Sequence, residues 1–100
     1  MNERLELIAS EPELTTLGFL RTDAPDYRNA RNTLIHDEVG WVSALLFLTR
    51  FGIPSEVKTC FELKKLAQRH STRCWLGTWQ LAVMASGYPT ERQLNDLKFL

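Results

Sequence analysis

The pattern of apolar and polar positions along the chain follows the spacing of α-helices. The clearest helix is predicted over residues 37–50, where Trp41, Leu45 and Leu48 recur at helical spacing. Acidic residues open this segment, and Gly52 follows it as a stop signal. Apolar residues occupy most of the circumference of this helix, so we expect it to pack against neighbours on several sides.

Capping residues predict the remaining helices. The sequences Ser10-x-x-Glu13, Thr59-x-x-Glu62 and Thr90-x-x-Gln93 have the form of capping boxes. The further predicted helices are a short one after Asn2 to about Ala9, and others over about 10–18, 24–34, 59–69, 73–86 and from Thr90. The end of the last segment, Leu97–Leu100, is also compatible with an extended strand.

These elements predict an all-α fold: a compact single-domain bundle of about five to six helices over residues 1–100. Trp41, Trp75 and Trp79 are expected in the core because they lie at helical spacing among other apolar residues. The segment 73–86 is accordingly interpreted as a buried core helix. In the preceding helix, the inward-facing residues are predicted to be Phe61, Leu63, Leu66 and Ala67.

Composition excludes several classes of protein. The chain has 100 residues, of which 44% are hydrophobic and 24% charged, which is typical of a globular domain rather than a disordered tail. Two cysteines are too few for a disulfide scaffold, and they are interpreted as free thiols in the core. The most apolar run, residues 39–48, is about half of the roughly 20 residues that span a bilayer. A cytoplasmic protein is therefore expected.

The cysteines and histidines offer one candidate metal site. Cys60, His70 and Cys74 are the nearest cluster of ligand types, with His70 and Cys74 one helical turn apart. A structural zinc ion needs four ligands, and no fourth is evident. We therefore expect no metal and no other cofactor.

The residues for catalysis are also sparse. His36, Asp37 and Glu38 are adjacent, but neighbouring residues on a helix do not face each other. The sequence has neither a Gly-x-Ser-x-Gly nor a His-Glu-x-x-His motif, and no phosphate-binding glycine loop. The protein is therefore not expected to be an enzyme.

The net charge of zero hides an asymmetry. Residues 1–40 contain eight acids and four arginines, a net charge of −4, and residues 41–100 carry +4. The acidic part supplies a candidate surface for a basic protein partner. We call its chosen members the acidic set: Glu3, Glu11, Glu13, Asp23, Asp26, Asp37 and Glu38.

The basic part suggests a different partner. Five bases and one acid lie within residues 58–73, just before a turn and another helix. This order raises a helix-turn-helix hypothesis, in which these bases contact phosphates. We call them the basic set: Lys58, Lys64, Lys65, Arg69 and Arg73. The second helix is poor in polar side chains that could read bases.

Part of the chain resembles a family of small phage and mobile-element proteins. That family has a Tyr/Phe-x-Leu-Lys-x-x-Ala segment, then Asn-Gly, an Ala-rich helix and Gly-Phe/Tyr. The matching residues are Phe61, Leu63, Lys64, Ala67, Gly77, Ala82, Gly87 and Tyr88. The match covers about residues 60–88, and Leu76 stands where the family has Asn. The family implies no catalytic residue.

In size and charge pattern the chain is also similar to the anti-CRISPR inhibitors. That resemblance implies a stoichiometric inhibitor that binds a host CRISPR effector complex, type I in particular, and blocks its nucleic-acid binding. The acidic set would make the contact. Two alternatives remain open: a nucleic-acid-binding phage regulator that uses the basic set, and a small virion assembly protein that self-associates.

Overall fold

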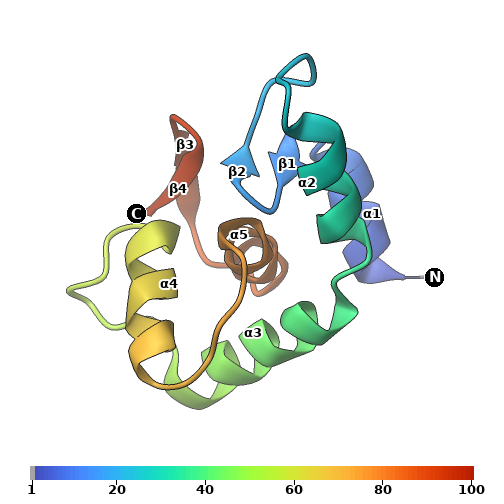
Figure 1. Ribbon diagram of the computed structural model, residues 1–100. Coiled ribbons are helices and arrows are strands. Elements are labelled where there is room, and N and C mark those ends of the chain that lie inside the picture. The colour runs from blue at the N-terminus through green and yellow to red at the C-terminus, as the bar shows by residue number, and fades with distance from the viewer. Residues whose placement is uncertain (1) are drawn as a thin grey trace.

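The computed structural model describes residues 2–100, which form five helices and two antiparallel β-hairpins (Figure 1). The expected all-α fold is therefore wrong, because the structure is mixed, although mostly helical. The elements in chain order are α1 (Glu3–Ser10), β1 (Leu14–Thr15), β2 (Gly18–Phe19), α2 (Tyr27–Ile35), α3 (Glu38–Phe51), α4 (Cys60–Arg69), α5 (Leu76–Ala85), β3 (Thr90–Gln93) and β4 (Asp96–Phe99).

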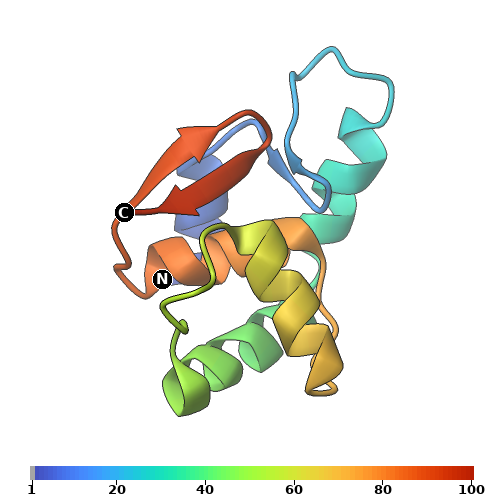
Figure 2. The same cartoon turned by 90° about the vertical axis from the view of Figure 1, so that its left-hand side faces the viewer.

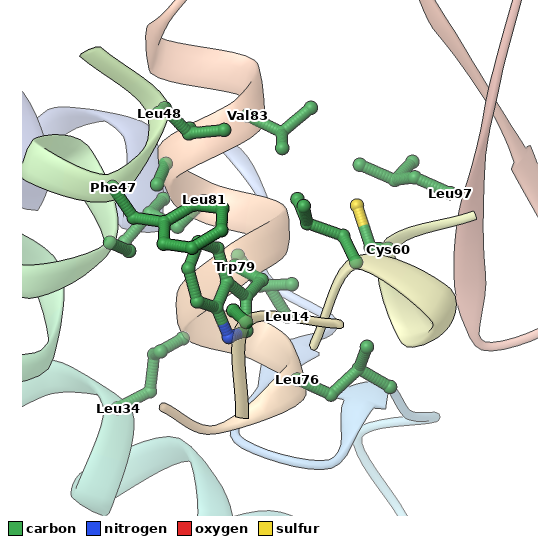
Figure 3. Close-up of a cluster of buried hydrophobic side chains, with 14 of the residues drawn as sticks. Leu14, Leu34, Phe47, Leu48, Cys60, Leu76, Trp79, Leu81, Val83 and Leu97 are labelled. Atoms are coloured by element: carbon green, nitrogen blue, oxygen red, sulfur yellow. The ribbon is translucent and has the colours of Figure 1, made fainter. Parts of the chain in front are cut away.

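Helix α5 is the centre of the molecule. Figure 1 shows it almost end-on, with α3 below it, α4 on one side and the β1–β2 hairpin above. Every residue from Leu76 to Val83 is buried, as the interpretation of a core helix requires. Trp79 is fully buried and meets the Phe47 ring edge-on at 5.3 Å (Figure 3). Such T-shaped pairs favour a fixed core geometry.

Three predicted helix starts are confirmed by their side-chain caps. The Asn2 side chain accepts a hydrogen bond from the Leu5 amide, and Asp37 accepts one from Gly40. Thr59 accepts one from the Glu62 amide. Each cap satisfies an amide that has no partner within the first turn of its helix. Local capping chemistry therefore set the starts of α1, α3 and α4.

The first capping box does not start a helix. Ser10 donates its hydroxyl back to the Leu7 carbonyl, within α1, and Glu13 pairs with Arg92 instead of capping. The chain turns and forms the β1–β2 hairpin, in which Leu14 pairs with Phe19. Gly18 adopts a φ of 97°, a conformation that other residues rarely take. The predicted helix over residues 10–18 is therefore wrong.

The third capping box is also misleading, because Thr90–Gln93 is strand β3. It pairs with β4 through a two-residue turn at Leu94 and Asn95. Leu94 has a φ of 57° at a position where such turns usually carry glycine. β4 also meets the segment before α4, where Thr59 bridges Lys98. Of the alternatives for the chain end, the extended one is confirmed.

Arg31 ties the N-terminal elements together. From α2, its guanidinium donates to the carbonyls of Ile8 at 2.7 Å, Glu11 at 2.7 Å and Leu14 at 2.8 Å. These carbonyls belong to the last turn of α1, the residue after it and β1. One planar, permanently charged side chain therefore joins three elements.

We expect Arg31→Met to lower the free energy of unfolding by about 3 kcal/mol, because three partly buried carbonyls lose a charged donor. Arg28→Met is the matched control, since Arg28 lies on the same helix and is exposed. Urea unfolding followed by circular dichroism measures both. Equal stability of the two variants would contradict this assignment.

Candidate functional site

An open groove with aromatic, apolar and basic walls lies beside the start of α5. It consists of two adjoining hollows that share Lys64 and Trp75. We call it the Trp75 groove and define it by Leu17, Phe61, Lys64, Arg73 and Trp75. Its residues come from the β1–β2 turn, from α4 and from the loop between α4 and α5, which are far apart in the sequence.

Trp75 is the central residue of this groove. Its side chain is 49% exposed, so the expectation that it lies in the core is wrong. The reason is its backbone, since Trp75 precedes α5 with φ −65° and ψ 152°, which is extended. Of the three tryptophans, Trp79 lies on α5 and is buried in the core. Trp41 lies on α3, is half-buried and packs against the core.

The backbone around Trp75 is held on both sides. The thiol of Cys74 donates to the Gly40 carbonyl at 3.4 Å, and the Gly77 amide donates to the Thr16 carbonyl at 3.1 Å. The Trp75 carbonyl accepts from the Trp79 amide. A large aromatic side chain is therefore presented from an anchored backbone, which lowers the entropy lost on binding.

Phe61 forms the opposite aromatic wall. It is 50% exposed, so its predicted inward orientation is wrong, whereas Leu63 and Ala67 of the same helix are buried as predicted. The buried side of α4 runs through Cys60, Leu63 and Ala67, and Phe61 lies outside that stripe. The ammonium group of Lys65 lies 5.6 Å from the centre of the Phe61 ring, a cation–π arrangement.

The basic set mostly borders this groove. Lys64 and Arg73 line it, and Lys65 covers the Phe61 ring. Arg69 is in the last turn of α4, where a positive charge is favourable. Lys58 lies before α4, and its ammonium group donates to the Ser55 carbonyl.

The acidic set is distributed over several elements, and four of its members already have partners within the chain. Glu13 pairs with Arg92, Asp23 pairs with Arg21 at 2.9 Å, and Glu38 lies 3.6 Å from Arg4.

Asp37 uses both carboxylate oxygens, one for the Gly40 amide and one for the Thr78 hydroxyl at 3.0 Å. Glu3 opens α1, Glu11 follows it, and Asp26 precedes α2 without a capping bond from its side chain.

Asp96 lies at the groove and forms a hydrogen-bonded junction between neighbouring elements. One carboxylate oxygen accepts from the Phe61 amide at 3.0 Å. The other accepts from the buried Gln80 side chain at 2.8 Å and from the Leu97 amide at 2.7 Å. Asp96 therefore joins α4, α5 and β4 and fixes the start of α4, which carries Phe61. No sequence motif indicated this role.

Both cysteines are free thiols, Cys60 in the core and Cys74 half-buried. Among residues 2–100, no three side chains of His, Cys, Asp or Glu gather closely enough to hold a metal ion. Burial, followed by the negative charge of Asp37, raises the pKa of Cys74 to about 11. Burial, followed by Asp96, raises the pKa of Cys60 well above its usual range.

These pKa shifts predict a loss of stability at alkaline pH. The unfolded chain releases the Cys74 proton near 9.0, whereas the folded protein holds it to about 11. Stability is therefore complete below 9.0 and declines as the pH rises through that interval. Urea unfolding over this range should show a smaller decline in Cys74→Ala than in Ser71→Ala, a control at an exposed neighbour. Identical declines would contradict the expectation.

No family model, no curated protein and no solved structure matches this chain. In the part of the chain that the structure describes, no helix has the length and apolar character needed to cross a bilayer.

Proposed function

We propose that this protein is a phage or mobile-element inhibitor that binds a host CRISPR effector complex of type I, without a chemical step, through the Trp75 groove. It would work in the cytoplasm of the host bacterium and block nucleic-acid binding by stoichiometric contact. The resemblance to the anti-CRISPR inhibitors supplies the class of partner. The composition of the groove supplies the contact surface.

The observation that carries the proposal is the exposure of Trp75 and Phe61 beside Lys64 and Arg73. Half-exposed aromatic side chains next to basic ones are typical of the residues that dominate binding energy at protein interfaces. A solitary exposed apolar residue needs no such explanation, whereas here two aromatic rings and Leu17 border one depression.

Charge indicates what the groove contacts. Lys64 and Arg73 line it together with Asp37 and Asp96, whose carboxylates accept hydrogen bonds from neutral groups within the chain. The two cations would pair with carboxylates on the partner. The proposed contact therefore uses a different surface from the acidic set, whose Glu3, Glu11 and Asp26 would require a basic partner surface.

Two charge-reversal variants separate these surfaces. Binding to a purified type I effector is measured by biolayer interferometry for the wild type, for Lys64→Glu with Arg73→Glu, and for Glu3→Lys with Glu11→Lys. We expect the first pair to abolish binding and the second to leave it nearly unchanged. The reverse outcome would transfer the contact to the acidic set. A wild-type protein that does not bind the effector would overturn the proposed function.

A second candidate function is binding of single-stranded nucleic acid. The observation that favours it is the arrangement of Lys64, Lys65 and Arg73 around two exposed aromatic rings, because bases stack on such rings while cations follow the phosphates. Helix α5 is buried and cannot enter a major groove as a recognition helix. The affinity for a labelled single strand, measured by fluorescence anisotropy, should then fall steeply as the salt concentration rises. No binding at low salt would remove this candidate.

A further inference from the structure

A separate hollow lies between the second half of α3 and the loop that joins α4 to α5. Its volume is about 770 Å³, within the range of pockets that hold small molecules. In Figures 1 and 2, the end of α4 and the loop after it lie next to α3. We call it the Arg50 hollow and define it by its two arginines and four hydroxyl-bearing residues, which are Arg50, Arg73, Ser43, Thr49, Ser71 and Thr72.

The charge of the Arg50 hollow is positive. Arg50 lies in the last turn of α3 and Arg73 in the α4–α5 loop, and both are exposed. None of the three ion pairs formed within residues 2–100 involves either arginine. Among the residues that the structure describes, no acidic one lines the hollow. Guanidinium groups bind phosphate through paired N–H donors, so two of them without a carboxylate suit a phosphate group.

The carbonyl oxygens at the end of α4 do not compete for these arginines. The Ala67 carbonyl accepts from the Thr72 amide at 2.9 Å, and the Gln68 carbonyl accepts from the Ser71 amide at 3.2 Å. These two bonds form a Schellman motif, which closes the end of a helix. The arginines of the hollow are therefore not needed to satisfy this helix end.

Ser71 gives an independent indication of a ligand. It occupies the left-handed position of the Schellman motif, with a φ of 68°, where glycine is the usual residue. A side chain at such a position costs stability. Ser71 nevertheless has a hydroxyl group, and it lines the Arg50 hollow. Strained backbone of this kind clusters at ligand-binding sites, and a hydroxyl can donate to a phosphate oxygen.

One wall of the hollow is apolar. Phe51 is 58% exposed and Leu46 is 64% exposed, and both line the hollow. The Phe51 ring lies 4.8 Å from the Phe47 ring and is stacked at 6.3 Å with the His70 ring. These neighbours hold the Phe51 ring in place while it stays accessible. A ring held in this way can stack on a flat heterocycle such as a nucleic-acid base.

We propose that the Arg50 hollow binds a nucleoside monophosphate. Arg50 and Arg73 pair with its phosphate, the Ser71 hydroxyl donates to a phosphate oxygen, and the base packs against Phe51. The site does not rest on the function proposed for the Trp75 groove. Because Arg73 lines both hollows, the tests below change Arg50 and Ser71, which do not line the groove.

Isothermal titration calorimetry with adenosine monophosphate tests the choice of ligand. We expect saturable binding to the wild type. Adenosine lacks the phosphate and ribose phosphate lacks the base, and we expect each to bind about tenfold more weakly or worse. No binding of adenosine monophosphate at millimolar concentration would overturn the proposal. Equal affinity for adenosine, or for ribose phosphate, would also overturn it.

An arginine variant tests the location of the site. Arg50→Gln should bind adenosine monophosphate about tenfold more weakly than the wild type. Arg69→Gln is the matched control, because Arg69 is an exposed arginine at the end of α4 that does not line the hollow. An equal loss in both variants, or no loss in Arg50→Gln, would overturn the assignment. Arg50→Gln should bind the type I effector like the wild type, so failure of this site and failure of the proposed function are distinguishable.

Two substitutions of Ser71 separate binding from stability. Ser71→Gly relieves the left-handed backbone, so it should melt about 4 °C above the wild type and bind adenosine monophosphate about threefold more weakly. Ser71→Ala keeps the strained backbone, so it should lose the same affinity without the gain in melting temperature. Wild-type affinity in both variants would contradict the role of the Ser71 hydroxyl.

Discussion

Replacing Gly77 by alanine should lower the free energy of unfolding by about 3 kcal/mol or more, because α5 has no room for a methyl group at this position. A Cβ atom at Gly77 would lie 1.7 Å from the Thr15 carbonyl oxygen and 2.6 Å from its carbon. Both are backbone atoms of the β1–β2 hairpin, so the contact cannot be relieved by a rotamer change. The hydrogen bond from the Gly77 amide to the Thr16 carbonyl would also be broken.

The sign of this effect is informative, since alanine usually stabilises a helix relative to glycine by about 1 kcal/mol. Thermal unfolding should show Gly77→Ala melting roughly 12 °C or more below the wild type. Gln68→Ala, an exposed substitution on α4, is the control and should melt close to the wild type. A Gly77→Ala protein that is as stable as the wild type would show that the hairpin does not pack on α5 in this way.

Asp96→Ala should produce the other large loss, again about 3 kcal/mol, because one carboxylate joins three elements. Its removal leaves the Phe61 and Leu97 amides without their acceptor. It also removes one of the two acceptors of the Gln80 amide group, which is fully buried. The loss of one carboxylate that holds α4, α5 and β4 together accounts for most of the expected cost, since Gln80 keeps its bond to the Asn95 carbonyl.

Asp26→Ala is the matched control for this loss. Asp26 is exposed at the start of α2, and its side chain makes no capping bond. Urea unfolding should therefore give nearly wild-type stability for Asp26→Ala and a clearly lower midpoint for Asp96→Ala. Similar midpoints for the two variants would contradict the role of Asp96 as the junction of α4, α5 and β4.

The helices were predictable because their signals are local. The side chains of Asn2, Asp37 and Thr59 cap helices by contacts within one turn, and Gly52, with a φ of 64°, ends α3 where the sequence indicated. Such signals act between residues that are three or four positions apart.

The hairpins were not predictable because their signals are long-range or missing. Strands β1 and β2 have two residues each, too few for an alternating pattern. The turn at Leu94 lacks the glycine that usually marks it. Glu13 pairs with Arg92, 79 positions away, and does not cap a helix. Tertiary contacts therefore overrode local propensity at both capping boxes.

The candidate site was predictable only in part. Lys64 and Arg73 were recognisable as members of a basic cluster, whereas Trp75 and Phe61 were assigned to the core from their spacing. Trp75 precedes α5 with an extended backbone, and Phe61 lies outside the buried side of α4, so neither ring follows the helical stripe from which its burial was inferred. Gly77, one of the residues on which the resemblance to phage proteins rests, has a structural role in this fold. It allows the Thr15–Thr16 backbone to lie against α5.

The Trp75 groove is the proposed binding surface for the partner, and one pair of variants tests this role most directly. Isothermal titration calorimetry of the purified type I effector should show that Trp75→Ala weakens binding by about 2 kcal/mol, or roughly thirtyfold. Leu94→Ala, which truncates a 90% exposed apolar side chain that does not line the groove, should bind like the wild type. Wild-type affinity in Trp75→Ala, with the fold intact by circular dichroism, would contradict the claim.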